Sequence, residues 1–134
     1  MAMSLQARQA QANTAADEFS KIYYETFDKR RQAISKLYQD KANVVWNGNA
    51  VAGSDAIIKL FDGLPSSEHT VDGLDTQPIV AGPVDADNTN SIMVTVFGKV
   101  KFKDTGAEAF TQTFILSAAE NKWKIISDTF RFVI

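Results

Sequence analysis

Few residues of this 134-residue chain could carry acid–base or nucleophilic chemistry. The chain has one histidine, His69, and no cysteine, so a thiolate nucleophile and a cysteine-ligated zinc site are excluded. With a single histidine, a Ser-His-Asp triad or a two-histidine metal site is hard to build. His69 could form an acid–base pair with Asp75 or Asp128, but no spacing in the sequence requires it. We interpret His69 as a structural or solvated residue at the start of a strand.

Two other aspartates have structural interpretations. Asp28 precedes the segment KRRQAISKLY and is predicted to be the N-cap of a short helix. Asp128 shares a strand face with Phe130, which predicts a buried carboxylate with Arg30, Arg31 or tyrosine side chains as its partners. The sequence also lacks a phosphate-binding loop and a dinucleotide motif. We therefore predict no catalytic residue, no metal site and no cofactor.

Composition and charge narrow the class of protein. A chain with 45% hydrophobic and 22% charged residues can build a core without disulfides or metals. Its formal net charge of −2 argues against binding nucleic acid by charge alone, and the basic clusters DKRRQ and KVKFK are interpreted as solvated. No apolar run has the length of a signal peptide or a membrane span, so we expect an intracellular protein without membrane contact. Residues 1–15 lack apolar anchors and are predicted as an extension that frays, which leaves residues 16–134 as one domain.

The first part of the chain is predicted to form three helices. Phe19, Ile22, Tyr23 and Phe27 recur at three- and four-residue steps, the period of one helical stripe. A second, short helix is expected over KRRQAISKLY. The third covers DAIIKLFDGL, with Ser54 as its N-cap.

The remaining segments are predicted to be strands. A short strand at 44–46 leads into Asn47-Gly48, a strong signal for a two-residue hairpin turn. Four long strands follow, HTVDGLDTQPIV, SIMVTVFGKVKF, AFTQTFILSA and KWKIISDTFRFVI, with a bulge at Gly73 and a strand end at Pro78. The loops between them are GPVDADNTN, KDTGAE and AENK. Helices followed by strands indicate an α+β fold, with helices packed on one face of an antiparallel sheet.

Both faces of the predicted strands are poor in charge. Alternate side chains of a strand point to opposite faces, and one face carries Val94, Val96, Val100, Phe102, Phe110, Phe114, Leu116, Ile126, Phe130 and Phe132. The other carries Met93, Thr95, Phe97, Thr111, Thr113, Ile115, Ile125, Thr129 and Arg131. The helices cover the first face, so we predict that a second subunit covers the other, where Arg131 would need a partner's carboxylate. In the alternative, bulges turn some of these residues toward water and Arg131 reaches solvent.

The ordered series YYETFDKRR, LYQDKANVVWNGNAVAG, DAIIKLFDGLPSSEH, DTQPI, FTQTFILSA and KWKIISDTFRF resembles the nuclear transport factor 2 family over residues 16–132. The stretches VWNGNAV, LPSSE, VKF and SDTFRF are most similar to its export branch, the small subunits of the heterodimeric mRNA export receptor. The resemblance implies a cone-shaped fold, in which three N-terminal helices pack on a curved antiparallel sheet.

The same resemblance implies a function without catalysis. The chain would pair through its outer sheet face with the large subunit of the mRNA export receptor and support nuclear export of mRNA through nuclear pores. The interface would consist of Met93, Thr95, Phe97, Thr111, Thr113, Ile115, Thr129 and Arg131, and the arginine of FRF would form an intersubunit ion pair. FG-repeat nucleoporins and RNA would be reached through the complex, which would shuttle between nucleus, pore and cytoplasm.

Two alternatives stay open. The first is a homodimeric carrier of GDP-bound Ran, but such carriers have WEG where this chain has Asn47 in WNG, and the turn KDTGAE offers only Asp104 and Glu108. Ran binding is therefore not expected. The second is a small-molecule isomerase or dehydratase, which would need His69 or a carboxylate in a pocket at the cone mouth near Trp46.

Overall fold

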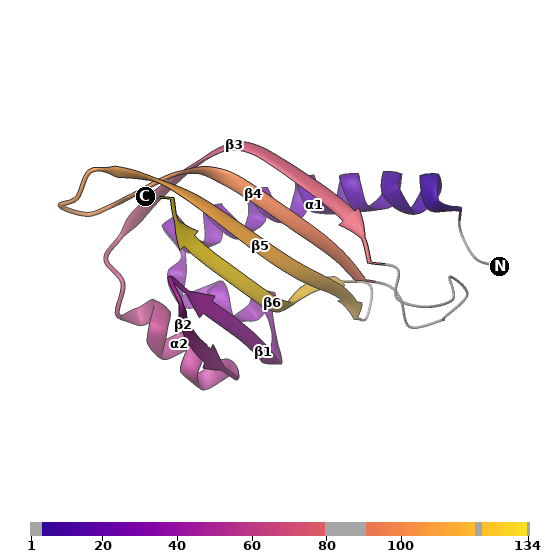
Figure 1. Ribbon diagram of the computed structural model, residues 1–134. Helices are drawn as coiled ribbons and strands as arrows, with labels where there is room; N and C mark the ends of the chain where they lie inside the picture. Colours follow the sequence, from indigo (N-terminus) through magenta and orange to yellow (C-terminus); the bar gives the residue numbers. More distant parts are fainter. Residues whose placement is uncertain (1–3, 80–90, 120–121, 134) are drawn as a thin grey trace.

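The computed structural model describes residues 4–79, 91–119 and 122–133, and its elements follow the predicted α+β order (Figure 1). A long helix and a 3-10 helix come first, a hairpin and a short helix follow, and four long strands complete the chain. The elements are α1 Leu5–Lys29, η1 Arg31–Leu37, β1 Tyr38–Trp46, β2 Asn49–Ala52, α2 Ser54–Asp62, β3 Ser67–Pro78, β4 Ser91–Phe102, β5 Ala107–Ala119 and β6 Lys122–Phe132.

Within the described residues, six strands form one sheet in the order β2-β1-β6-β5-β4-β3. Neighbouring strands are antiparallel, except that β1 and β6 run parallel. The sheet is therefore mixed, where a purely antiparallel sheet was predicted. Alternating hydrophobicity shows that a segment is a strand, but it does not show which neighbour the strand will pair with.

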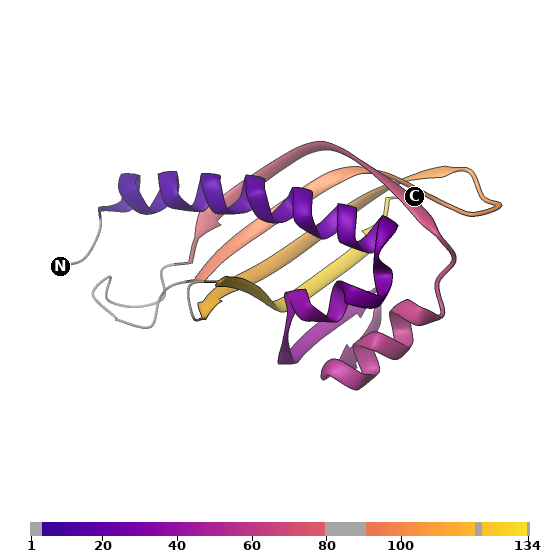
Figure 2. The ribbon, with the colours of Figure 1, turned by 180° about the vertical axis from the view of Figure 1, so that it is seen from behind.

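The helices lie on one face of the sheet, and α1 runs along the long strands (Figure 2). Phe19, Tyr23 and Phe27 are buried against the sheet, as predicted. Ile22 is not in the core, because 52% of it is exposed. Each residue turns a helix by about 100°, so Ile22 points roughly 140° away from Phe27. Tyr24 is buried instead.

Both predicted helix caps are wrong. Helix α1 continues to Lys29, so Asp28 lies in its last turn and uses its carboxylate elsewhere. Ser54 is the first residue of α2, whose N-cap is Gly53 without a capping side chain. Gly53 has a φ of 88°, a conformation that favours glycine.

The predicted turns and irregularities of the strands are confirmed. Asn47 and Gly48 both have positive φ, 48° and 87°, as a two-residue hairpin turn requires. The pairing of β3 with β4 shifts register just before Gly73, and Pro78 ends β3 at the edge of the sheet. The predicted loop GPVDADNTN lies outside the described residues, as does the centre of AENK.

One strand position was assigned to the wrong face. Ile125 is fully buried and pairs with Leu116, whereas Ile126 is half-buried. The pairing of β5 with β6 shifts register here, between Ile115 and Leu116. A bulge inverts the alternation of a strand beyond it, so the prediction of Ile126 in the core and Ile125 outside is wrong.

Helix α1 extends further toward the N-terminus than the family resemblance. It begins at Leu5, and the side chain of Ser4 accepts a hydrogen bond from the backbone N–H of Ala7 (3.1 Å). The amide of Gln9 donates to the backbone oxygen of Thr76 in β3 (2.9 Å). The division into residues 1–15 and 16–134 stays a prediction.

Asp128 in β6 is buried, as predicted, and its partners are a tyrosine and an amide rather than an arginine. Tyr38 donates to Oδ2 of Asp128 (2.6 Å), and Nε2 of Gln112 donates to Oδ1 (2.9 Å). The hydroxyls of Tyr23 and Tyr38 are 2.7 Å apart, and Tyr24 donates to Oε1 of Gln112 (2.8 Å). The network ties α1 to β1, β5 and β6. Burial raises the pKa of Asp128 to about 6, although these hydrogen bonds act in the opposite direction.

The raised pKa of Asp128 predicts a pH-dependent stability. The folded chain holds the proton of Asp128 more tightly than the unfolded chain does. The stabilisation of the fold by this proton is therefore full below about pH 4 and is lost as the pH rises through 6. Asp128→Asn lacks this titration. As the pH rises from 4 to 7, its free energy of unfolding minus that of wild type should therefore increase by about 2–3 kcal/mol. Urea unfolding across this range measures it, with the exposed Asp72→Asn as control. A constant difference between Asp128→Asn and wild type would contradict it.

Gly98 in β4 marks a close approach of β3. A Cβ at this position would meet the carbonyl oxygen of Thr70 and lie 3.1 Å from Cα of Val71. Both are backbone atoms, so Gly98→Ala should lower the free energy of unfolding by about 1–3 kcal/mol. At Gly106 an added Cβ meets nothing within 4 Å. Gly106→Ala should therefore leave the urea midpoint nearly unchanged, and equal losses for the two variants would refute this explanation.

Candidate partner-binding interface

The face of the sheet opposite the helices, here called the outer face, has a central row of threonines. Thr95, Thr113 and Thr129 are direct neighbours across β4, β5 and β6, and Val45 of β1 continues the row. The hydroxyls of Thr95 and Thr113 are 3.5 Å apart. The sequence did not place Val45 here, since its strand joins the sheet through the parallel pair with β6.

Hydrophobic side chains flank this row on both sides. Met93 of β4 pairs with Ile115 of β5 on one side, and Phe97 pairs with Thr111 on the other. Met93 is 37% exposed and Phe97 47% exposed. The ring of Phe97 lies over Gly73 of β3, where any larger residue would collide with it. The structure thus places together all eight residues that were predicted to form an interface, and their role as an interface stays a prediction.

Arg131 is the cation next to the threonine row, while Lys99 and Lys101 of β4 lie on the same face nearer the β4–β5 turn. Arg131 is exposed and pairs in register with Thr111 of β5. Among the described residues, the ion pairs join Lys21 with Asp17 and His69 with Asp28, and none involves Arg131. Its guanidinium therefore stands beside Thr111 and Thr129, and no ion pair among the described residues supplies it with a carboxylate.

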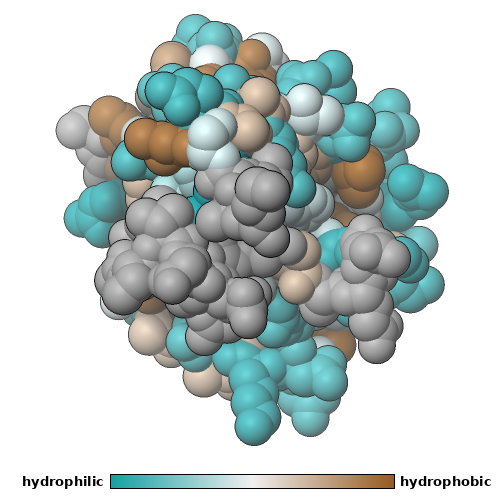
Figure 3. Space-filling model, turned by 90° about the vertical axis from the view of Figure 1, so that its right-hand side faces the viewer, coloured by the Kyte–Doolittle hydropathy of each residue, from teal (hydrophilic) through white to brown (hydrophobic). Residues whose placement is uncertain are grey.

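The outer face differs from a typical solvated surface. Seen from the end of the molecule where α1 begins, hydrophilic residues surround separate small hydrophobic patches (Figure 3). On the outer face, by contrast, Met93, Phe97 and Ile115 adjoin an unbroken row of threonines. Contiguous apolar surface of this kind usually marks a site of association.

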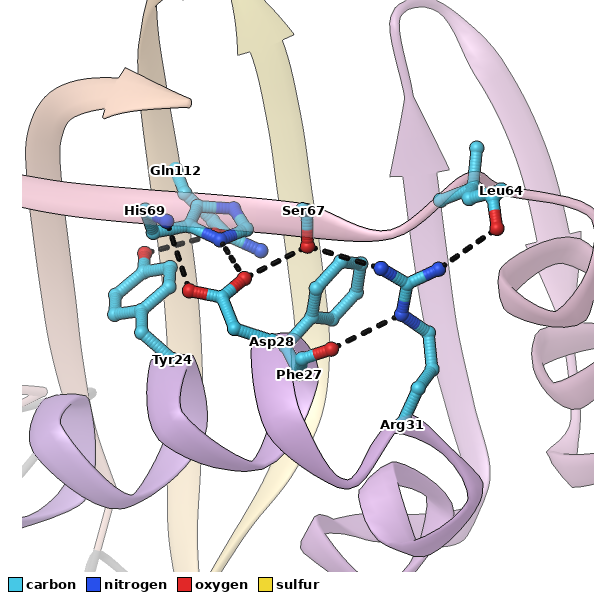
Figure 4. A network of polar contacts seen from close by, with 8 residues as sticks. All are labelled: Tyr24, Phe27, Asp28, Arg31, Leu64, Ser67, His69 and Gln112. Carbon is cyan, nitrogen blue, oxygen red and sulfur yellow. Dashed lines mark hydrogen bonds and ion pairs between the residues drawn. The ribbon is translucent and has the colours of Figure 1, made fainter. Parts of the chain in front are cut away.

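Asp28 and His69 form the acid–base pair of this chain (Figure 4). Nδ1 of His69 lies 2.7 Å from Oδ1 of Asp28, and the backbone N–H of His69 donates to Oδ2 (2.8 Å). The hydroxyl of Ser67 also donates to Oδ1 (2.7 Å). The partners considered from sequence, Asp75 and Asp128, are not used. Helix α1 brings Asp28 to β3 across 41 residues, a separation that no local spacing reveals.

The geometry of this pair suits packing better than catalysis. The side chain of His69 is only 2% exposed, with the rings of Tyr24 and Phe110 at 4.8 and 5.4 Å. Burial raises the pKa of Asp28, but hydrogen bonds from His69 and Ser67 outweigh it and hold the pKa below its usual value. The Ser67 hydroxyl bonds to the carboxylate and not to the imidazole, so the three residues do not form a nucleophilic relay.

Arg31 extends the same network toward α2, and the interpretation of DKRRQ as solvated is wrong for this residue. Its guanidinium donates to the backbone oxygens of Phe27 (3.0 Å) and Leu64 (2.9 Å) and to the hydroxyl of Ser67 (2.9 Å). It also lies over the ring of Phe27, 4.4 Å from the centroid. Arg31 thus fastens the end of α1 to the segment between α2 and β3.

Two cavities lie near these elements. One, of about 470 Å³, opens beside Trp46 and is lined by Trp46, Leu64, Pro65, Val100, Phe102, Thr105, Glu108 and Phe132. Its carboxylate, Glu108, is exposed and does not belong to the Asp28–His69 pair. The other, of about 440 Å³, lies beside Asp28 and is lined also by residues 66–68 and 101–104. The Asp28–His69 pair and the carboxylate of Glu108 therefore do not meet in one pocket.

Two negative findings hold for the described residues. No cluster of three or more histidine, aspartate or glutamate side chains there could hold a metal ion. No helix in the same ranges is both long enough and apolar enough to cross a membrane.

Comparison with known proteins gives consistent results. The model of the nuclear transport factor 2 (NTF2) domain matches residues 15–132. Human NTF2-related export protein 2 is 48% identical over 126 residues, which cover 91% of this chain and 87% of the relative.

Solved structures share the fold at lower identity. Nuclear transport factor 2 from Cryptosporidium parvum superposes with a TM-score of 0.79 at 25% identity, covering 92% of this chain and 95% of that one. A chain of the C. albicans Mtr2-Mex67 M domain complex superposes with a TM-score of 0.76 at 15% identity, covering 90% of this chain and 94% of that one. A putative scytalone dehydratase from Novosphingobium aromaticivorans superposes with a TM-score of 0.76 at 12% identity, covering 96% of this chain and 89% of that one. These two similarities show the fold alone. By its fold, and by the match over nearly all of its length, the chain belongs to the nuclear transport factor 2 family.

Proposed function

We propose that this chain is a non-enzymatic small subunit that pairs through its outer face with the large subunit of an mRNA export receptor. The observation that carries the proposal is the outer face itself, a threonine row flanked by Met93, Ile115 and Phe97 and left open by the helices (Figures 1 and 2). A relative with 48% identity is named an export protein. A structural neighbour was solved as the Mtr2-Mex67 complex, a pair of different chains.

Burial of the outer face supplies the driving force for this pairing. Removing apolar surface from water stabilises a complex by roughly 25 cal/mol per Å² before the losses of association are counted. A stable interface buries roughly 1,600 Å² in total. Four long strands offer a surface of this kind, and the methyl groups of Thr95, Thr113 and Thr129 pack while their hydroxyls can bond across the interface.

Arg131 supplies specificity to the pairing. A guanidinium enclosed by a second sheet needs an acceptor, and a carboxylate of the partner can accept two parallel hydrogen bonds from it. In a symmetric pair of two copies, two Arg131 side chains that met at the two-fold axis would repel each other, whereas a different partner can place a carboxylate opposite Arg131. The proposed pairing is therefore between different chains.

The complex places the chain in mRNA export. Together with the large subunit it would touch FG-repeat nucleoporins, pass with mRNA through nuclear pores to the cytoplasm, and return to the nucleus in a shuttling cycle. In this proposal residues 16–134 act as the pairing domain, and residues 1–15 are an extension of it.

The closed Asp28–His69 pair favours this function over the dehydratase or isomerase alternative. A general base has to come within hydrogen-bond reach of the substrate proton. The imidazole of His69 is enclosed by rings, and both oxygens of Asp28 already accept hydrogen bonds within the chain. The lining of the cavity beside Trp46 includes the exposed Glu108, but it includes neither Asp28 nor His69.

Asn47 bears on the alternative of a Ran carrier. Its side-chain Oδ1 accepts a hydrogen bond from the backbone N–H of Phe132 (2.9 Å), and its own N–H donates to the backbone oxygen of Phe130 (2.8 Å). The amide therefore fixes the end of β6 beside the β1–β2 turn. A neutral residue with this role favours pairing with an export receptor over recognition of Ran.

Arg131→Glu should weaken the complex with the large subunit by about 2–5 kcal/mol, because one member of a desolvated charge pair is lost and replaced by a like charge. Titration calorimetry at matched salt measures the affinity, and thermal unfolding of the free variant checks its fold. Lys59→Glu on α2 makes the same change of net charge on the helix side and should leave the affinity unchanged.

Other outcomes would favour the alternatives. Equal affinities of Arg131→Glu and wild type would remove Arg131 from the interface. Retention of GDP-bound Ran by the wild-type chain, without pairing to the large subunit, would replace the proposal with the carrier function.

A further inference from the structure

A groove of about 850 Å³ lies at the end of the sheet where β1 and β6 both begin (Figure 1). None of its lining residues belongs to the eight predicted interface residues or to the cavities beside Trp46 and Asp28. The end of η1 and the first residues of both parallel strands form it, and its lining is Lys36, Leu37, Gln39, Asp40, Lys41, Lys122, Trp123 and Lys124.

The pairing of β1 with β6 explains why the groove exists. Tyr38 pairs with Ile125, but the next paired residues are Asn43 and Ser127. Four residues of β1, 39–42, therefore stand opposite the single residue Ile126 of β6. The excess makes β1 bulge away from β6, and three of these four residues, Gln39 to Lys41, line the opening.

The groove is strongly basic within an acidic chain. Its lining has four lysines and one aspartate, a formal charge of +3, whereas the whole chain has a formal charge of −2. The remainder of the chain therefore carries −5. Lys36, Lys41 and Lys122 are exposed, and no ion pair among the described residues engages any of the four lysines.

Trp123 is the aromatic residue among these lysines. It packs against the core while remaining half-buried, and it lines the groove together with the lysines. An aromatic surface bordered by cations is the arrangement that binds single-stranded nucleic acid, since bases stack on the ring and phosphates meet the ammonium groups. A purely solvated face would account for the lysines, but not for a tryptophan that keeps part of its ring in the lining of the same groove.

We propose that this groove binds a single-stranded nucleic acid segment, with a base on Trp123 and phosphates at Lys36, Lys41, Lys122 and Lys124. A duplex would fit less well, because its bases are already stacked on one another and cannot reach the indole. The proposal goes beyond the proposed pairing function and does not depend on it.

Fluorescence anisotropy of the full-length chain with a labelled oligouridine of about 12 nucleotides tests the proposal. Four lysine–phosphate contacts predict a slope of about −3 for the logarithm of the association constant against the logarithm of salt concentration. The double variant Lys41→Gln/Lys122→Gln should bind about tenfold more weakly at low salt and lose about 1.4 from this slope. Trp123→Leu should bind about tenfold more weakly with an unchanged slope, because stacking is lost while the charges remain.

Matched control variants distinguish a loss of binding in the groove from effects of net charge and of misfolding. Lys59→Gln/Lys103→Gln changes the net charge equally at exposed positions on α2 and in the β4–β5 turn, and should bind oligouridine like wild type. Arg131→Glu should also keep oligouridine binding, so a failure of the pairing proposal stays distinguishable from a failure here. The lysine variants keep the test valid if Trp123→Leu fails to fold.

Three results would overturn the proposal. The first is wild-type chain that does not bind oligouridine at low salt, or that binds it no better than a duplex of equal length. The second is an equal loss of affinity in the groove and control lysine variants. The third is binding of an oligoglutamate peptide in preference to oligouridine, which would assign the groove to an acidic protein segment.

Discussion

The centre of this sheet is poor in charge on both faces, and the helices cover only one of them; charged residues of the outer face such as Asp75, Lys99 and Lys101 lie toward its edge and the β4–β5 turn. This constraint shapes the rest of the structure. Helix α1 with η1 and α2 closes the inner face over a core of aromatic rings, in which Phe19, Tyr23 and Phe27 pack against the strands. The outer face keeps threonines and hydrophobic residues at the centre of β4, β5 and β6, where a soluble sheet would carry lysine and glutamate.

Polar contacts inside the molecule stabilise this arrangement, and they do not use the side chains of the predicted interface. Asp128 binds Tyr38 and Gln112 in the core, while Asp28 binds His69 and Ser67 at the rim of the sheet. Each carboxylate is satisfied by neighbours from distant segments, so helices and strands are locked in one register. The ionisable groups that could suggest an enzyme are thereby used for structure, and the exposed Arg131 remains available to a partner.

Much of the fold could be predicted from the sequence because the deciding signals were local. Asn47-Gly48 needs positive φ in a tight turn, and Pro78 cannot continue a strand ladder. The faces of β4 and β5 followed from simple alternation. The failures arose where one irregular residue or a distant contact decides the outcome. The bulge at Ile126 reversed the faces of its neighbours, and Asp28 met His69 rather than capping a helix. The parallel pairing of β1 with β6 and the basic groove that it opens depend on segments far apart in the chain.

The central claim is that a second, different protein covers the outer face, and the reaction rate of a single introduced thiol tests it most directly. The chain has no cysteine, so Thr129→Cys would place one thiol at the middle of the outer face, and Thr14→Cys would place one on exposed α1. Maleimide labelling of Cys introduced at Thr129 should slow at least about tenfold when the large subunit of the export receptor is added, as expected for a core interface position. Labelling at Thr14 should not change. Equal labelling rates at Thr129 with and without a bound large subunit would contradict the account.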